Sequence, residues 1–287
     1  MATLRDIRKR IRSVRSTRQI TKAMKMVAAA KLRKAQVQAE QMRPYAEKMT
    51  AMLGSLSAAA TENLSHPYFE KREVKRQTLV VITSDRGMCG AFNSNILRRA
   101  TQWLRERDQN AVEVVCVGRR ALLSFRKRTW TVVKSYNEFN ATLDFALVRD
   151  LVSLLTSRFV SGDTDEIYFL YTKFYSVARM RVHLEKFLNI ERPESTETTA
   201  SGLYIFEPDP NAIYSQLLPR FALVRTQAAL ADSFASEHAT RMIAMTMATN
   251  NAGEMIDSLT LQYNKARQAA ITKELLEVVS GAEALRA

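Results

Sequence analysis

The sequence is poor in residues that break helices and in residues that build covalent or metal frameworks. Its 287 residues include only eight glycines and six prolines. That argues against a loop-rich sandwich or a low-complexity chain and predicts long, uninterrupted helices. Two cysteines cannot form a disulfide framework, which favours a reducing compartment, and three scattered histidines lack zinc-ligand spacing. No apolar run reaches the roughly 18 residues of a membrane-spanning helix. We therefore expect no metal and no cofactor.

Acidic residues are almost absent from the N-terminal segment. Residues 1 to 34 hold twelve Lys or Arg against one acid, a local charge of +11, so only +3 of the total +14 remains for the other 253 residues. Such a segment is typical of a mitochondrial transit peptide, a nucleic-acid arm or a helix that meets an acidic protein. It contains no Phe, Tyr or Trp, which a nucleic-acid arm would use for base stacking.

Residues 4 to 56 have the pattern of one long helix. They contain a single proline and a single glycine, and apolar or small residues recur at steps of three and four. At about 1.5 Å per residue, such a helix would run roughly 80 Å, so we expect it to project beyond a compact domain. The predicted stripe comprises Leu4, Ile7, Ile11, Val14, Thr17, Ile20, Met24 and Val27.

The C-terminal segment has a more regular heptad pattern than residues 4 to 56. From Phe221 to Ala270, alternating steps of three and four residues give about seven heptads, which predicts a coiled coil with an alanine-rich seam. Both terminal helices need to bury a stripe, so we expect them to pair antiparallel.

The register of that pair follows from the helix ends. If the first helix ends near Leu56 and the second begins near Asn211, the numbers of two facing residues sum to about 267. Met24 then faces Met242, Leu4 faces Tyr263, and residues beyond about 264 form an unpaired tip.

The middle of the chain alternates short strands with helices, which predicts a mostly parallel sheet covered on both faces. We expect strands at 78–84, 112–117, 131–133 and 166–172, helices at 93–107, 121–126 and 143–159, an edge strand or hairpin arm at 180–188, and a mobile polar loop at 193–202. The predicted fold class is thus a Rossmann-like α/β domain plus a long antiparallel coiled coil. Its three parts are residues 1–60, 61–208 and 209–287.

The turn after the first strand, SDRGMCGAFN, carries two glycines where phosphate-binding loops lie. Its spacing matches neither GxGxxG nor GxxxxGK[ST], so we expect no nucleotide site. Cys89 in this turn has no base near it in sequence and is more simply a packed small side chain. Asp85 and Arg86 are as compatible with a structural pair as with a site. We assign no catalytic residue.

Four strings carry a resemblance to a known family: TRQITKAMKMVAAAKLRK at 17–34, TSDRGMCG at 83–90, FEPDP at 206–210 and NKARQAAITKELLEVVSG at 264–281. Through them, residues 4 to 281 closely resemble the gamma subunit of F-type ATP synthases. The resemblance implies a non-catalytic central rotor stalk that couples proton-driven rotation of the c ring to ATP synthesis or hydrolysis at the beta subunits. The implied partners are the alpha and beta subunits, the epsilon subunit and the c ring.

The resemblance also implies site residues and a location. Lys22, Lys25, Lys31 and Arg33 match a segment that faces an acidic beta-subunit loop, and Met24 and Arg241 match positions that couple rotation to catalysis. Arg267, Gln268, Thr272 and Glu274 match an upper contact with a beta-subunit loop; Tyr204 and Glu207 match a face toward the c ring. Because family strings begin within twenty residues of Met1, we expect shaft there rather than a transit sequence. The implied location is peripheral, at the cytoplasmic face of a bacterial inner membrane, bound through the complex.

One departure from the family and two alternatives stand beside this interpretation. The chain lacks the cysteine-bearing insertion of the chloroplast type, which argues against redox control. The main alternative is a basic coiled-coil nucleic-acid-binding protein, and the other is an α/β enzyme with a dimerising coil.

Overall fold

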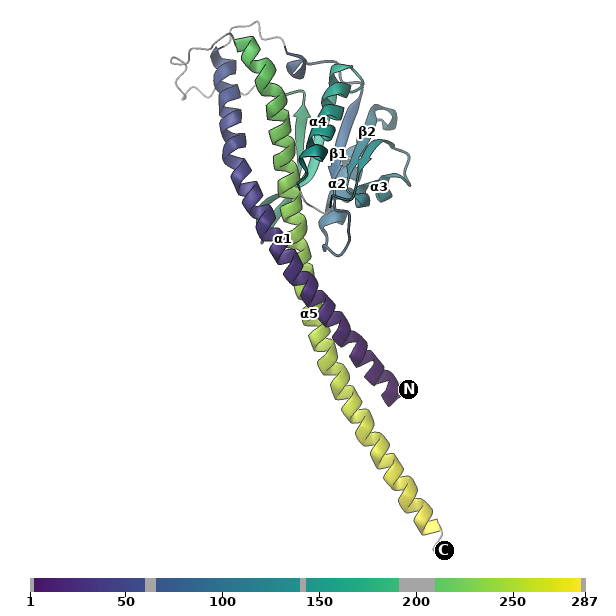
Figure 1. Cartoon of the computed structure of the whole chain (residues 1–287). Helices are drawn as coiled ribbons and strands as arrows, with labels where there is room; N and C mark the ends of the chain where they lie inside the picture. Colours follow the sequence, from purple (N-terminus) through teal and green to yellow (C-terminus); the bar gives the residue numbers. More distant parts are fainter. Residues whose placement is uncertain (1–2, 60–65, 140–142, 191–209, 285–287) are drawn as a thin grey trace. The chain divides into compact units, whose positions relative to one another are not determined.

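The structure is a computed structural model that describes residues 3–59, 66–139, 143–190 and 210–284. The chain divides into two compact units. We call Met1–Ala28 with Met242–Ala287 the paired-helix unit and Ala29–Arg241 the sheet unit. Two long helices, α1 (Leu4–Ala59) and α5 (Pro210–Ala284), contribute to both units (Figure 1).

The sheet unit alternates strands and helices in the predicted order. Its elements are the 3₁₀ turn η1 (Pro67–Phe69), β1 (Gln77–Ile82), α2 (Phe92–Arg105), the 3₁₀ turn η2 (Gln109–Ala111), β2 (Val112–Val117), α3 (Arg119–Phe125), β3 (Thr131–Tyr136), α4 (Phe145–Val160), β4 (Glu166–Ser176) and β5 (Arg179–Leu188). The strands form one sheet in the order β3-β2-β1-β4-β5. β1 pairs parallel with β2 and β4, β2 pairs parallel with β3, and β5 is an antiparallel edge strand. The predicted fold class is confirmed, and residues 180–188 form the edge strand.

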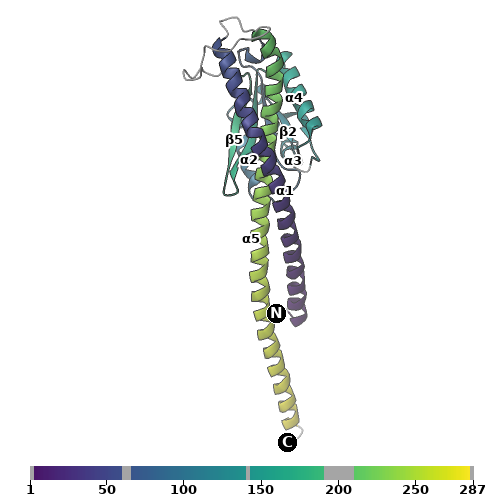
Figure 2. The ribbon, with the colours of Figure 1, turned by 60° about the vertical axis from the view of Figure 1, so that its left-hand side comes forward.

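Alternating strand residues feed two cores. Leu79, Val81 and Cys116 pack against α2 and α3 on one face of the sheet. Val80 and Ile82 point to the other face, where α4 and the sheet-unit parts of α1 and α5 cover them (Figure 2). The central strands are buried on both faces, which explains why TLVVI and VEVVCV are continuous apolar runs rather than alternating ones.

The paired-helix unit is an antiparallel pair whose register differs from the predicted one. Arg8 donates from Nη2 to the hydroxyl of Tyr263 over 2.5 Å, and Thr249 donates to Thr21 over 2.9 Å. The facing numbers therefore sum to 271 and 270, not 267, so pairing Leu4 with Tyr263 and Met24 with Met242 was wrong by about one helical turn. Part of the error came from the helix ends, because α1 continues to Ala59 and α5 begins at Pro210.

The stripe on α1 also departs from prediction after Val14. Thr21 and Ala28 are buried, whereas Ile20 is 57% and Val27 58% exposed, and Thr17 is exposed as well. The observed seam keeps steps of seven residues from Ile7, through Thr21 and Ala28, because a coiled-coil seam follows position in the heptad rather than side-chain size. On α5 the predicted seam is confirmed. The apolar residues buried there in this unit are Met245, Ala252 and Ile256.

The last described turns of α5 have no helix beside them. Every residue from 271 to 282 is exposed, which confirms the predicted unpaired tip. Five of these residues are large and apolar, and each is 49% to 69% exposed: Ile271, Leu275, Leu276, Val278 and Val279.

Candidate functional site

A polar cluster of the sheet unit lies at the carboxyl edge of its parallel strands. The chain runs from β1 through β2 to β3 toward one edge, then crosses back to place β4 on the other side of β1. Open α/β sheets bind ligands at such a switch point. Here the position is taken by the chain itself, because Ser236 of α5 donates its hydroxyl to the carbonyl oxygen of Thr172 in β4 over 3.1 Å.

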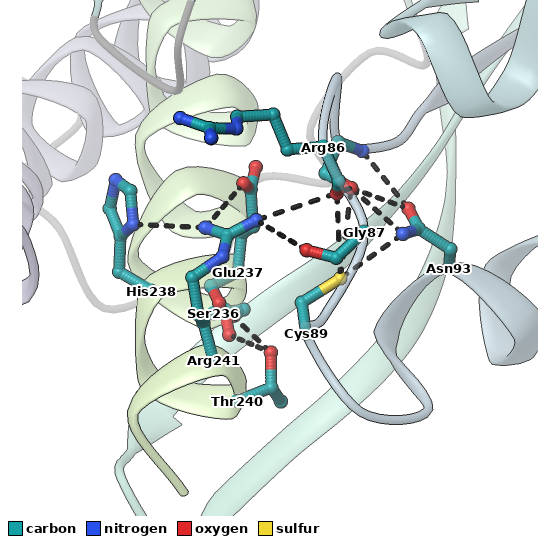
Figure 3. A network of polar contacts seen from close by, with 10 residues as sticks. Arg86, Gly87, Cys89, Asn93, Ser236, Glu237, His238, Thr240 and Arg241 are labelled. Atoms are coloured by element: carbon teal, nitrogen blue, oxygen red, sulfur yellow. Dashed lines mark hydrogen bonds and ion pairs between the residues drawn. The ribbon is translucent and has the colours of Figure 1, made fainter. Parts of the chain in front are cut away.

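Arg241 connects α5 to the loop that follows β1, which we call the 84–93 loop (residues 84–93; Figure 3). Its Nη1 lies 2.7 Å from Oε1 of Glu237 and 3.4 Å from Nδ1 of His238. Its Nη2 donates to the carbonyl oxygens of Arg86 and Gly87, each at 3.4 Å. One guanidinium thus joins a carboxylate, a ring nitrogen and two backbone carbonyls.

The root of the 84–93 loop is braced by two polar side chains. The amide nitrogen of Asn93 donates to Oγ of Ser84 at 2.8 Å and to Sγ of Cys89 at 3.1 Å. Ser84 in turn donates to the carbonyl oxygen of Arg86 at 2.6 Å. Cys89 is 1% exposed, as expected for a packed small residue, and burial raises the pKa of its thiol.

Burial dominates the electrostatics of this cluster. Glu237 is 4% exposed, and residues 229 to 239 of α5 are all buried. Burial raises the pKa of Glu237, and the carboxylate of Asp85 raises it further, while Arg241 and Lys31 act in the opposite direction. The ion pair with Arg241 lets the carboxylate remain in this enclosed position.

The 84–93 loop presents the wrong groups for a phosphate. Phosphate-binding loops turn backbone N–H groups toward the ligand. This loop turns the carbonyl oxygens of Arg86 and Gly87 toward a cation instead. In the described part of the chain, no group of three His, Cys, Asp or Glu side chains could hold a metal ion.

A second, partly buried ion pair ties α5 to the edge strand. Arg225 pairs with Glu185 of β5 and donates from Nη2 to the carbonyl oxygen of Lys186 at 2.8 Å. The hydroxyl of Tyr171 donates to Glu185 at 2.9 Å. Burial raises the pKa of Glu185, but the charge of Arg225 and the hydrogen bonds from Arg225 and Tyr171 outweigh it, so the pKa is lowered overall.

The structure distributes the sequence-predicted residues over several places. Lys22, Met24 and Lys25 lie on α1 in the paired-helix unit, whereas Lys31 and Arg33 lie on α1 in the sheet unit. Lys22, Lys31 and Arg33 are exposed, and Met24 and Lys25 are partly buried.

The remaining predicted residues lie on α5 or outside the described ranges. Arg267, Gln268, Thr272 and Glu274 are all exposed on α5, at or next to the unpaired tip. Arg241 is the centre of the network described above. Tyr204, Glu207 and the predicted polar loop at 193–202 lie outside the described residues.

Sequence reasoning missed the partners of Arg241. Glu237 precedes Arg241 by four residues, which is the spacing of an ion pair on one helix face. That signal was available. The contact with the 84–93 loop was not, because it joins residues 155 apart in the chain.

Across the residues that the structure describes, no helix combines the length and the hydropathy needed to cross a membrane.

Comparison with known proteins identifies the family. The family model described as ATP synthase (ATP-synt) matches residues 3–285. The chain is 45% identical over 286 residues to the ATP synthase gamma chain of Moorella thermoacetica and 42% identical over 291 residues to that of Chlorobaculum parvum, with 100% of each chain covered.

Solved structures share the fold at low sequence identity. A chain of the Euglena gracilis mitochondrial ATP synthase (OSCP/F1/c-ring, rotational state 3) matches with a TM-score of 0.68 at 19% identity, covering 98% of this chain and 94% of that one. A chain of the Tetrahymena thermophila mitochondrial ATP synthase (central stalk/c-ring) matches with a TM-score of 0.60 at 24% identity, covering 80% and 99%. The family model and the full-length relatives show that the chain belongs to the ATP synthase gamma chain family.

Proposed function

We propose that the chain is the central rotor stalk of an F-type ATP synthase. In this proposal it couples proton-driven rotation of a c ring to ATP synthesis or hydrolysis at catalytic sites of the beta subunits, and it has no active site of its own. Full-length identity of 45% to a gamma chain is the observation that carries the proposal. The 84–93 loop turns backbone carbonyls toward the Arg241 guanidinium rather than N–H groups toward a phosphate, which supports the proposal that the chain has no active site.

The exposed surface of the paired-helix unit supports a shaft that runs inside other subunits. Ile20, Val27 and Met247 are between 57% and 61% exposed, and the tip adds five more large apolar side chains. Apolar surface of this extent marks contact with other proteins. We assign the tip, with Arg267, Gln268, Thr272 and Glu274, to a contact with the upper part of an alpha–beta ring.

The positive charge of α1 supports an acidic protein partner. We assign Lys22, Lys25, Lys31 and Arg33 to a contact with acidic beta-subunit loops, and Met24 and Arg241 to the coupling of rotation with catalysis. Tyr204 and Glu207 are assigned to the c ring, with the epsilon subunit beside the α/β domain. The proposed location is the cytoplasmic face of a bacterial inner membrane, bound through the complex.

The three-part division at residues 1–60, 61–208 and 209–287 belongs to the same proposal. In it, the terminal parts form the shaft and the central part binds epsilon and the c ring. Neither a nucleic-acid-binding role nor an independent α/β enzyme is favoured, because the family match spans both the basic helix and the central domain.

Reconstitution tests the proposal directly. Purified chain is mixed with alpha and beta subunits, and ATP hydrolysis and complex size are measured with and without it. We expect a complex with one copy of the chain per ring of alternating alpha and beta subunits, and hydrolysis that depends on the chain. Saturable binding of Mg-ATP to the isolated chain at micromolar concentration, or a failure to join the ring, would contradict the proposal.

A further inference from the structure

The 84–93 loop is held in a conformation that the backbone alone does not favour. Met88 has a φ of 61°, in the left-handed region, and Gly90 follows with a φ of 56°. For a residue with a side chain, this region costs roughly 1–2 kcal/mol. The side chains of Arg86 and Met88 are exposed at the loop tip, so the contacts that offset the strain must come from beneath the loop.

Arg241 supplies the contacts from α5. Its two bonds to the loop carbonyls are long at 3.4 Å each, but the donor is charged and the side chain is only 12% exposed. Hydrogen bonds from a charged donor are stronger than neutral ones, and low dielectric strengthens them further. The guanidinium can remain there only while a carboxylate neutralises it, and Glu237 lies on the preceding turn of the same helix.

We propose that Glu237 is a positioning residue which, by holding the Arg241 guanidinium under the 84–93 loop, forms a latch that keeps this loop closed and the thiol of its own Cys89 buried. The closed latch fixes the exposed Arg86 and Met88 relative to α5. When the latch opens, the strain at Met88 is released and the buried thiol meets solvent. This inference concerns the chain itself and goes beyond its role in an assembly.

The two native cysteines report the latch. Cys89 is itself a loop residue whose side chain is buried, at 1% exposed, whereas Cys116 lies in β2 and is 0% exposed. Local opening of the loop exposes only Cys89, while global unfolding exposes both. The full-length chain is treated with N-ethylmaleimide at one fixed pH, and the modification rate of each cysteine is measured by mass spectrometry of peptides.

We expect Glu237→Gln and Arg241→Gln each to raise the rate at Cys89 at least tenfold and to leave Cys116 unchanged. Arg241→Lys keeps the positive charge but lacks the planar fork that contacts Glu237 through Nη1 and the loop carbonyls through Nη2, so it should raise the rate at Cys89 about threefold while the chain remains folded. Glu277→Gln is the matched control. It breaks the exposed Lys273–Glu277 pair, which has the same spacing on the same helix, and should change neither rate.

A charge exchange separates positioning from simple pairing. Glu237→Arg combined with Arg241→Glu restores opposite charges at the same spacing but removes the donor beneath the loop. The proposal predicts that Cys89 stays reactive in this double variant. Protection of Cys89 by the exchange, unchanged rates in both single Gln variants, or a parallel rise at Cys116 would each overturn the latch.

Discussion

The hydroxyl of Thr249 in α5 donates to the hydroxyl of Thr21 in α1 over 2.9 Å, and this contact fixes the register of the paired-helix unit. A disulfide requires Cα atoms roughly 4.4–6.8 Å apart, so it reports such adjacency. We expect Thr21→Cys with Thr249→Cys to oxidise to an intrachain bridge. Arg18→Cys with Thr249→Cys, which the sequence-based sum of 267 would favour, should not. The bridge is read by gel mobility after free thiols are blocked. A bridge in the variant with Arg18→Cys but not in the variant with Thr21→Cys would instead support the register with a sum of 267.

Gly118, between β2 and α3, should be among the least replaceable residues of the sheet unit. Its φ is 99°, and an added Cβ would lie 2.3 Å from the carbonyl oxygen of Thr83. We expect Gly118→Ala to lower the free energy of unfolding by at least about 2 kcal/mol, because backbone strain and a collision combine. Urea unfolding followed by the fluorescence of Trp103 and Trp130, both in this unit, measures the change.

Gly162 provides the comparison for that substitution. It also has a positive φ, 80°, but its nearest neighbour to an added Cβ is a side-chain nitrogen at 3.7 Å. Gly162→Ala should therefore cost only the backbone strain, about 1 kcal/mol. Equal losses at the two positions would show that the close approach of Thr83 to Gly118 is unimportant.

Glu185 should make the sheet unit sensitive to acid. Its pKa is lowered below the ordinary value of 4.5, so its pairing with Arg225 stabilises the fold above about pH 4.5 and is lost as the pH falls through the lowered pKa. We expect Glu185→Gln to cost about 2 kcal/mol at neutral pH, because Arg225 keeps its position without a counter-ion. The variant should then lose less stability than the native chain between about pH 5 and pH 3.

Glu73→Gln is the control for the pH experiment. Glu73 pairs with Lys75 at the surface, where the two side chains are 83% and 74% exposed, so its loss should change stability little at any pH. An acid-dependent loss of the same size in Glu185→Gln and in the native chain would rule out Glu185 as the source.

The basic residues of α1 should act together rather than singly. Exposed ion pairs are each worth about 0–1 kcal/mol, so Arg33→Gln alone should barely weaken binding to alpha and beta subunits. Replacing Lys22, Lys25, Lys31 and Arg33 together should weaken binding strongly at low salt and less at high salt, because salt already screens these charges. Binding measured by calorimetry across salt concentrations tests this. Loss of assembly from one substitution at every salt concentration would exclude a distributed contact.

The sequence predicted the sheet better than the site. Continuous apolar runs such as Leu79–Ile82, in which three of the four residues are β-branched, identify buried strands. Their alternation with helices implies a parallel sheet, so those elements lie close to their expected bounds. The predicted stripe of α1 is wrong after Val14. Ile20 and Val27 are larger and more apolar than the neighbouring Thr21 and Ala28, but the partner helix covers Thr21 and Ala28. The link from Arg241 to Gly87 depends on how α5 lies at the sheet edge, which no local pattern encodes.

Because the first helix pairs with the last, it must wait for its partner while the chain is being synthesised. Arg8 meets Tyr263, 255 residues later, so the seam of α1 has no partner until nearly the whole chain has been made. At roughly 5–20 residues per second, that wait lasts about 13–50 s on the ribosome. During it, seam residues such as Ile7 and Ala28, which are buried in the folded pair, are available for wrong contacts. The twelve basic side chains between Arg5 and Lys34 repel other copies of the same nascent segment, and so protect it from aggregation until α5 emerges.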